Sequence, residues 1–318
     1  MKIAVLTSGG DAPGMNAAVR AVVRKGIYND CQVFGIREGF RGIIDDDIIP
    51  LQLGSVADVI QRGGTFLRTA RCEEFQTPQG LAKAIANLRR REIQAVIVIG
   101  GDGSIRGAQA LNEGGITAVA IPGTIDNDIP ATDFTIGFNT AVNTASEAID
   151  KIRDTATSHQ RTFIVELMGR RSGAIALAAG LAAGAESILV PELPYDLDEV
   201  CRRLESGRRR GKLHSIILVA EGIASAYEVA AELKKRTNQD TRVIVLGHLQ
   251  RGGSPTAFDR ILASRMASEA VDLVLAGQGG KLVVLKNGHY TSVDITYALA
   301  QRESFDIEAF QLAKILSI

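Results

Sequence analysis

Short apolar runs alternate with longer amphipathic segments along the whole chain. Strand-like runs cover residues 2–6, 33–36, 95–99, 117–121, 163–167, 187–190, 216–220 and 243–246. Segments with helical spacing or many small residues separate them, at 15–28, 56–60, 138–152, 174–183, 196–209 and 227–235. Uniformly apolar strands followed by helices are typical of parallel sheets covered by helices on both faces. We therefore predict an α/β fold with mainly parallel sheets. Near the end of the chain, residues 281–285 and 290–293 flank Asn287-Gly288, which predicts a β-hairpin.

Composition limits the partners that this chain can have. Its 318 residues are enough for two domains, and its 36 basic and 36 acidic side chains cancel. A chain without net charge is not drawn to nucleic acid or to a membrane surface. The absence of tryptophan and the low aromatic content also argue against platforms for base stacking. We expect neither a nucleic-acid partner nor a membrane partner.

The cysteines and the N-terminus suggest a reducing compartment. Cys31, Cys72 and Cys201 show neither metal-site nor disulfide-framework spacing. No apolar stretch approaches the ~18 residues of a membrane span, and Met1 leads directly into a strand pattern without a signal peptide. We expect a cytoplasmic protein.

One short loop carries the densest candidate chemistry. Residues 122–128, Pro-Gly-Thr-Ile-Asp-Asn-Asp, follow the apolar run 117–121. The carboxyl end of a parallel strand is where open α/β folds bind ligands. Asp126 and Asp128 could place two carboxylates beside the Thr124 hydroxyl, one to take a proton and one to orient a partner or metal. Taken alone, such a loop favours the simpler interpretation of an Asx-rich turn between a strand and a helix.

Two further strand-end loops favour a ligand site. Gly100-Gly101-Asp102-Gly103-Ser104 follows the run 95–99, and residues 7–14 follow the first strand. Glycines allow backbone N–H groups to approach a ligand, and a loop that opens into a helix is a natural phosphate site. Asp102 suits a phosphate-bound magnesium better than a phosphate, because a carboxylate repels phosphate. The first loop lacks the Walker lysine and the dinucleotide fingerprint.

Cationic segments accompany these loops. Residues 62–72 interleave small residues with three arginines, and Met168-Gly169-Arg170 forms another strand-to-helix turn. His248 lies beside Arg251 and two glycines, which makes it the best ligand candidate among the histidines. Arg20 and Arg24 are neighbours on a predicted helix, where they could simply face solvent.

Together these segments resemble the bacterial ATP-dependent 6-phosphofructokinases over essentially the whole chain. The resemblance rests on residues 6–18, 63–71, 100–104, 122–128, 168–170 and 247–260. It implies a homotetramer of two-domain subunits that transfers the γ-phosphoryl group of MgATP to the 1-hydroxyl of fructose 6-phosphate in glycolysis. The two similar three-layer domains would be residues 1–137 with 250–300, which bind ATP, and 138–249 with 301–318, which bind the sugar phosphate.

The resemblance also assigns active-site roles. Asp126 would be the base and Asp102 the magnesium ligand, and the positions matching catalytic residues are Gly10, Arg71, Thr124, Asp126 and Arg170. The ATP site would comprise Gly10, Arg71, Cys72, Gly101, Asp102, Gly103 and Ser104. The sugar-phosphate site would comprise Thr124, Ile125, Asp126, Asp128, Arg161, Met168, Gly169, Arg170, Glu221, Arg242, His248, Leu249, Gln250 and Arg251. Arg161 and Arg242 would act across a subunit interface.

An effector site for ADP or phosphoenolpyruvate is implied at another subunit interface. The matching positions are Arg20, Arg24, Asp58, Arg153, Gly184, Ala185, Glu186, Arg210, Lys212, Leu213 and His214. Leu213 stands where close relatives commonly have a basic residue, and Leu53 stands where some have arginine. These departures bear on the affinity and on the choice of effector.

Three other functions remain open from the residues. A pyrophosphate-dependent phosphofructokinase would typically carry Asp and Lys where this chain has Gly103 and Gly123. Lipid and NAD kinases also use a GGDG loop, but they do not account for the segment 251–260. A non-catalytic sensor on the same scaffold would need neither Asp102 nor Asp126.

Overall fold

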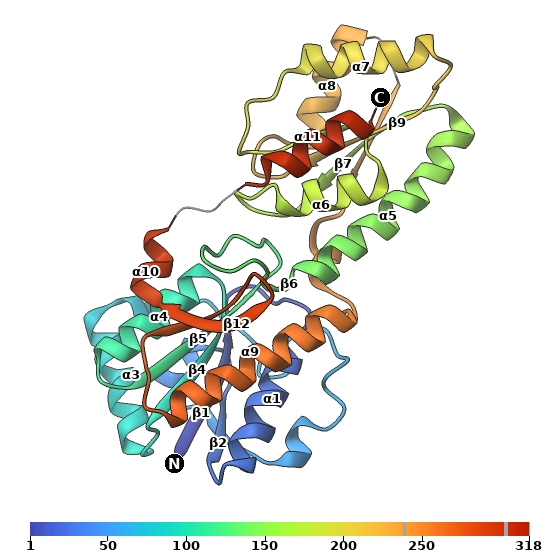
Figure 1. Ribbon diagram of the computed structural model, residues 1–318. Helices are drawn as coiled ribbons and strands as arrows, with labels where there is room; N and C mark the ends of the chain where they lie inside the picture. Colours follow the sequence, from blue (N-terminus) through green and yellow to red (C-terminus); the bar gives the residue numbers. More distant parts are fainter. Residues whose placement is uncertain (238–239, 302–304, 318) are drawn as a thin grey trace. The chain divides into compact units, whose positions relative to one another are not determined.

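The computed structural model describes residues 1–237, 240–301 and 305–317 (Figure 1). The chain divides into two compact units. Unit 1 is Met1–Thr140 with Arg251–Glu303, and unit 2 is Ala141–Gln250 with Ser304–Ile318. The chain therefore leaves unit 1 and later returns to it. Which ligand each unit binds stays a prediction.

Unit 1 is built around a mixed sheet. Its elements are β1 (Lys2–Ser8), α1 (Met15–Tyr28), β2 (Gln32–Ile36), α2 (Phe40–Ile44), β3 (Ile48–Leu51), η1 (Leu53–Val56), η2 (Glu74–Gln76), α3 (Pro78–Arg90), β4 (Ala95–Gly100), α4 (Asp102–Glu113), β5 (Thr117–Thr124), β6 (Ile136–Gly137), α9 (Ala257–Leu275), β11 (Lys281–Lys286), β12 (His289–Asp294) and α10 (Ile295–Ala300). Two elements, α5 (Phe138–His159) and η3 (Gly247–Arg251), contain two of the three points where the chain passes between units.

The strand order explains why the central strands are continuously apolar. In the described part of unit 1 the eight-stranded sheet runs β12-β11-β5-β4-β1-β2-β3, with β6 beside β5. Pairing is parallel except at the two edges, where β2 pairs with β3 and β11 with β12 in antiparallel register. Central strands are buried on both faces by helices, so both sets of alternating side chains are apolar. The hairpin predicted around Asn287-Gly288 is confirmed.

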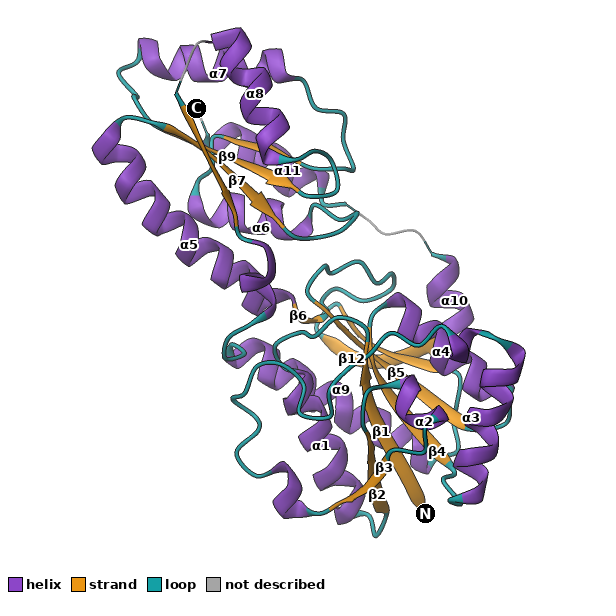
Figure 2. Ribbon diagram, turned by 180° about the vertical axis from the view of Figure 1, so that it is seen from behind, coloured by secondary structure: helices purple, strands orange, loops and turns teal. Residues whose placement is uncertain are grey.

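Helices cover both faces of this sheet. Ala4, Val98 and Ala120 point to a core that also contains Leu88 of α3 and Ile105 of α4. Figure 2 shows α3 and α4 on one side of the strands, and α1 and α9 on the other. The unit is therefore a helix–sheet–helix sandwich.

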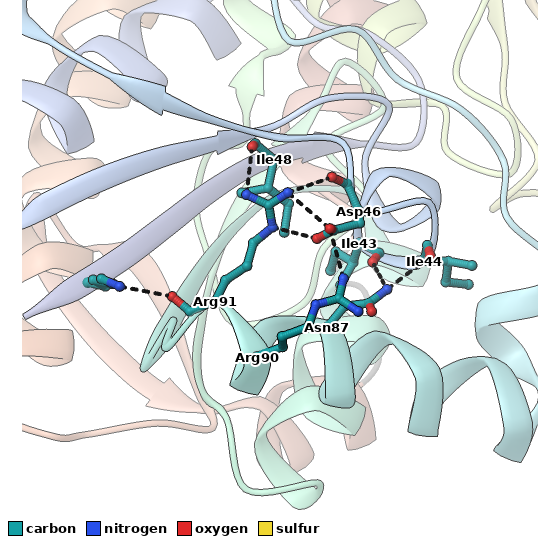
Figure 3. Close-up of polar contacts among 8 residues, drawn as sticks. Ile43, Ile44, Asp46, Ile48, Asn87, Arg90 and Arg91 are labelled. Carbon is teal, nitrogen blue, oxygen red and sulfur yellow. Dashed lines mark hydrogen bonds and ion pairs between the residues drawn. The ribbon is translucent and has the colours of Figure 1, made fainter.

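A polar cluster fastens α3 to the turn before β3 (Figure 3). Asp46 has a left-handed backbone with φ of 61°, and its carboxylate accepts hydrogen bonds from Arg91 Nε at 2.5 Å and Arg90 Nη2 at 2.8 Å. The bond from Arg91 is the main reason that the pKa of Asp46 is lowered. Nearby, the Asn87 amide donates to the carbonyls of Ile43 and Ile44, which satisfies the end of α2.

Unit 2 repeats the layered plan on a smaller scale. Its elements are β7 (Thr162–Leu167), α6 (Ala174–Ala183), β8 (Ser187–Leu189), α7 (Leu197–Arg209), β9 (Ser215–Ala220), α8 (Ala226–Thr237), β10 (Thr241–Val245) and α11 (Ile307–Leu316). Among the described residues its four strands are all parallel, in the order β10-β7-β9-β8.

Small residues let α6 approach this sheet closely. A Cβ on Gly180 would lie 2.5 Å from Ile188 Cδ1 and 3.1 Å from Leu218 Cδ1. On the opposite face Val200 and Leu204 of α7 and Val229 of α8 pack on Ile217 and Val219. The predicted α/β class with mainly parallel sheets is confirmed for both units.

One predicted helix is wrong. Residues 56–60 do not form a helix: the short 3-10 helix η1 ends at Val56, and Asp58 has a left-handed φ of 52°. An L-residue in that conformation interrupts a right-handed helix. No helix within residues 1–237, 240–301 or 305–317 combines the length and apolar character that a membrane span requires.

Candidate active site and effector site

The carboxyl ends of three neighbouring parallel strands carry the glycine-rich loops of unit 1. In the register of β1, β4 and β5, Ser8 lies opposite Gly100, and Gly100 lies opposite Pro122. The segments 9–14, 101–104 and 123–128 therefore lie at one edge of the sheet; the second includes the first residues of α4, and the third includes the end of β5. This is the edge at which open α/β folds bind ligands.

The loops also touch one another. A Cβ on Gly100 would lie 2.5 Å from both the Ser8 carbonyl and Ser104 Oγ, so only glycine fits there. A Cβ on Gly101 would lie 3.8 Å from the Thr124 Cβ. Thr69 Oγ1 donates to the Gly9 carbonyl at 2.7 Å, which ties the arginine-rich segment to the first loop. The loop residues of the predicted ATP site thus form one contiguous group.

Asp102 begins α4, and its side chain is exposed. Amide groups at a helix N-terminus attract phosphate, and a carboxylate beside them suits a phosphate-bound cation. Magnesium binds through one or two carboxylates together with substrate phosphates, so a single carboxylate at this position is enough for that role. No group of three or more His, Cys, Asp or Glu side chains that could hold a metal occurs in the described ranges.

The loop 124–128 is held in a defined conformation. Thr124 and Asp126 are buried, with 8% and 2% of their surfaces exposed. The Asp126 amide donates to Thr124 Oγ1 at 3.2 Å. Asn127 has a left-handed φ of 50°, and its Oδ1 accepts from the Thr135 amide at 2.8 Å. Asp126 therefore belongs to a rigid turn next to the loop 101–104, where a general base needs to be fixed.

The side chain of Arg251 contacts the first glycine-rich loop of unit 1, residues 9–14. Its Nη1 donates to the Asp11 carbonyl at 3.1 Å, and a Cβ on Gly10 would lie 2.4 Å from the same nitrogen. Arg251 was predicted with the sugar-phosphate residues, together with His248, Leu249 and Gln250. Its guanidinium lies beside Gly10, which is predicted for the ATP site, and the assignment of Arg251 to the sugar phosphate stays a prediction.

A buried carboxylate that the sequence analysis missed also supports this region. Asp259 accepts hydrogen bonds from the Gly137 amide at 3.0 Å and from the amide and hydroxyl of Thr140 at 2.8 and 2.5 Å. Burial raises the pKa of Asp259, while these bonds act in the opposite direction. Its position in the segment 251–260 was the signal that could have identified it.

In unit 2 the turn after β7 is organised by two side chains from other segments. Glu221 Oε1 accepts from the amides of Gly169 and Arg170 at 3.3 and 2.8 Å. Gln250, which is fully buried, accepts from the Met168 amide through its Oε1 at 3.0 Å. Gly169 and Arg170 both have positive φ. The structure therefore brings together five of the predicted sugar-phosphate residues.

Two predicted phosphate-binding arginines share a carboxylate. Arg161 Nε and Arg242 Nη1 lie 3.4 and 2.9 Å from the carboxylate of Asp240. The two cations are adjacent because β7 and β10 pair in parallel. Sequence reasoning missed Asp240, and only its nearness to Arg242 in the chain gave a signal. His248 and Leu249 are exposed on η3.

Glu186 gathers several of the predicted effector residues. This residue, only 6% exposed, pairs with Arg153 Nη1 at 3.6 Å and with Lys212 Nζ at 2.5 Å. Arg153 Nη2 donates to the carbonyls of Ala183 and Gly184 at 2.6 and 2.9 Å. Cations held by a buried carboxylate form a rigid, locally positive surface.

Other predicted effector residues lie around this group or in the other unit. His214 Nε2 is 3.5 Å from Thr157 Oγ1 on the same helix as Arg153. Arg210 and Leu213 are exposed. Arg20, Arg24 and Asp58 belong to unit 1.

Comparisons with known proteins give a consistent result. Residues 2–274 match the family model for phosphofructokinase. The chain is 58% identical to "ATP-dependent 6-phosphofructokinase" from Bacillus cytotoxicus, over 100% of this chain and 99% of that protein. It is equally similar to the protein of the same name from Brevibacillus brevis, with the same coverage.

Solved structures agree with the sequence comparison. Phosphofructokinase from Saccharomyces cerevisiae superposes with a TM-score of 0.88 at 36% identity, over 94% of this chain and 45% of the yeast chain. A pyrophosphate-dependent phosphofructokinase from Marinobacter aquaeolei has a TM-score of 0.85 at 23% identity, over 98% of this chain and 91% of that chain, which indicates a shared fold. By its sequence and its architecture, the chain belongs to the phosphofructokinase family.

Proposed function

We propose that this protein transfers the γ-phosphoryl group of ATP to the 1-hydroxyl of fructose 6-phosphate, which yields ADP and fructose 1,6-bisphosphate in glycolysis. The observation that carries the proposal is the buried Asp126 in a fixed turn beside the loop 101–104, in a chain 58% identical to ATP-dependent 6-phosphofructokinases. Phosphoryl transfer depends on positioning and charge neutralisation, and these loops are suited to both.

The acceptor side of the reaction requires a base and a sugar-phosphate pocket. Asp126 takes the proton of the 1-hydroxyl as the phosphoryl group is transferred. Glu221, fixed through Oε1 by two backbone amides, has a second oxygen to accept from a sugar hydroxyl. Arg161 and Arg242, aligned by Asp240, are suited to the 6-phosphate, because guanidinium groups bind phosphate in bidentate geometry.

The donor side relies on the backbone of unit 1. Amides of the loops at Gly10 and 101–104 bind the phosphates of ATP, and Arg71 and Cys72 line the nucleotide. Asp102 would hold Mg²⁺, which neutralises the charge of the phosphates. Gly103 supports ATP rather than pyrophosphate as donor, because pyrophosphate-dependent phosphofructokinases typically carry Asp at this position. Glycine leaves the adjacent space open to the phosphates of ATP, since no protein atom lies within 4 Å of where a Cβ would be.

Assembly and regulation form the finer part of the proposal. The protein acts as a homotetramer in the cytoplasm, and ADP and phosphoenolpyruvate bind at a subunit interface. The predicted residues of that interface site are those gathered around Glu186 and also Arg20, Arg24 and Asp58. The cationic surface made by Arg153 and Lys212 supports a phosphate ligand.

A coupled assay tests the activity. Purified protein would be given ATP or pyrophosphate as donor, and fructose 6-phosphate or another sugar phosphate as acceptor. We expect turnover with ATP and fructose 6-phosphate, and at most a trace with pyrophosphate. Comparable rates with both donors would refute the proposed donor, and no turnover with any pair would refute the activity.

A further inference from the structure

A pocket of about 290 Å³ lies in unit 2 between β8, the segment that follows it, α7 and α11. Its apolar wall includes Ile188, Leu189 and Val200, and Phe310 and Ala313 of α11 close the opposite side. The volume is at the lower end of the range for small-molecule sites. Of the predicted site residues, only Ala185 and Glu186 reach its lining.

Two cations share one carboxylate at this pocket. Glu199 Oε1 accepts from Arg203 Nη2 at 3.1 Å and lies 3.0 Å from Lys314 Nζ. Both cations lower the pKa of Glu199, with Lys314 as the larger influence. One negative charge against two positive charges leaves a surplus cation at the pocket.

The other two acidic residues of the lining are neutralised from outside it. Asp196 accepts from the Asp198 amide at 2.8 Å and pairs with Arg202 at 3.3 Å. Glu186 pairs with Arg153 and Lys212. None of these three cations lines the pocket. The surplus charge of Arg203 and Lys314 is therefore not cancelled by its acidic neighbours.

We propose that this pocket binds a small organic carboxylate with an apolar, aromatic body. The body lies on the apolar wall, where Phe310 offers a ring face or edge. The carboxylate lies against Lys314 and Arg203. An ammonium group has three donors, of which Glu199 takes one, so Lys314 retains donors for a ligand.

The cationic end of the pocket is already ordered. Arg203 Nη1 donates to Ser317 Oγ at 2.9 Å and to the Glu186 carbonyl at 3.3 Å. Lys314 Nζ lies 5.6 Å from the centre of the Phe310 ring. Side chains held in this way lose little conformational entropy when a ligand binds. The proposed site is independent of the phosphotransferase activity.

Calorimetric titration of the full-length protein with 1-naphthoate and its uncharged analogue 1-naphthamide tests the proposal. We expect naphthoate to bind more tightly. Lys314→Gln should weaken naphthoate about twofold to fivefold, the effect of one partly exposed charge contact, and should weaken naphthamide less, because the amide carries no charge. Ala313→Leu narrows the apolar space and should weaken both ligands.

Lys235→Gln is the matched control, because Lys235 pairs with Glu232 at 2.7 Å on α8 and does not line the pocket. It should bind both ligands as the wild type does. Absence of naphthoate binding at millimolar concentration would overturn the proposal, as would equal affinity in wild type and Lys314→Gln. The comparison of naphthoate affinity between wild type and Lys314→Gln tests the proposal even if Ala313→Leu does not fold.

Discussion

The hydroxyl of Thr135 donates a hydrogen bond of 2.6 Å to the backbone carbonyl of Thr124. The amide of the same residue donates to Asn127 Oδ1 at 2.8 Å. Thr135 is fully buried and thus fastens the chain on both sides of Asp126. A residue that never needs to touch substrate can therefore determine where the proposed base lies.

Thr135→Val should lower kcat roughly tenfold with little change in KM for ATP. The substitution keeps the shape but leaves the Thr124 carbonyl without this donor, and small displacements of catalytic groups can cost up to about 10²-fold. Thr135→Ser keeps the hydroxyl and should retain nearly wild-type kcat. Steady-state kinetics of both variants measure this difference. If valine and serine behave alike, Thr135 contributes only packing.

Asp126→Ser should reduce kcat by ~10² to 10⁴-fold, the range for loss of a positioned general base. Affinity for both substrates should change little, because the base acts mainly in the transition state. Single-turnover kinetics together with binding calorimetry separate the two effects. A kcat for Asp126→Ser within a few-fold of the wild-type value would show that another group accepts the proton.

Apolar runs predicted the central strands well. The runs at 95–99 and 117–121 appear as β4 and β5, because both faces of these strands are covered by helices and nearly all of their side chains in these runs are apolar. The helix expected at 56–60 fails for a local reason. Its apolar spacing is compatible with a helix, but the left-handed Asp58 breaks it, and spacing alone carries no information on φ.

The candidate site was less predictable from sequence than the fold. The order of the strands brings the glycine-rich loops together, so the pattern of loops after strands was sufficient for them. Arg251 contacts Asp11, and Glu221 contacts Arg170, across long stretches of chain. Such contacts depend on packing between distant segments. Asp240 was missed because its role depends on two arginines that become neighbours only when β7 and β10 pair.

Gly103→Asp should severely depress ATP-dependent turnover without destabilising the protein. The fold has room for the side chain, since a Cβ at this position meets nothing within 4 Å, and an acid in the first turn of a helix is favourable. A carboxylate ~4 Å from a phosphate costs up to ~4 kcal/mol at an effective dielectric near 20. Gly103→Ala adds no charge and should be much less affected. Kinetics and thermal unfolding of the two variants test this, and equal kinetic losses would exclude charge repulsion.

Asp46→Asn should lower the free energy of unfolding by about 1 kcal/mol at pH 7, the upper value for a partly exposed ion pair. Asparagine tolerates the left-handed backbone, so the decrease in the free energy of unfolding measures the effect of removing the carboxylate charge. The folded pKa of Asp46 is lowered by Arg91 and Arg90. Its stabilisation is therefore complete above the unfolded pKa near 3.9 and is lost as the pH falls through the folded value.

Urea unfolding of wild type and Asp46→Asn between pH 7 and pH 3 measures this effect. The difference between the two proteins should shrink as the pH falls below about 4. Asp45→Asn is the control, because Asp45 is more exposed and pairs with Arg41 at 3.2 Å. A difference between wild type and Asp46→Asn that does not depend on pH would mean that the carboxylate charge is not responsible.

Arg210→Ala should weaken effector binding and leave the uninhibited kcat nearly unchanged. Arg210 caps the end of α7 and is exposed, whereas Arg153 and Lys212 are already engaged by Glu186. Arg210 is therefore better able than Arg153 or Lys212 to contact the phosphate of a bound effector. Loss of one such contact costs about 1.5–3 kcal/mol. The neighbouring Arg209→Ala removes the same charge one residue away and is the matched control.

Titration of phosphoenolpyruvate and ADP against fructose 6-phosphate saturation curves tests this assignment in both variants. If an effector weakens fructose 6-phosphate binding, linkage requires fructose 6-phosphate to weaken effector binding by the same factor. The coupling should be no stronger than in relatives with a basic residue at position 213, because Leu213 removes one cation. Arg210→Ala should raise the effector concentration that is needed to move the saturation curve, and Arg209→Ala should leave this concentration unchanged. If neither ligand moves the wild-type curve, the cations around Glu186 serve only to stabilise unit 2.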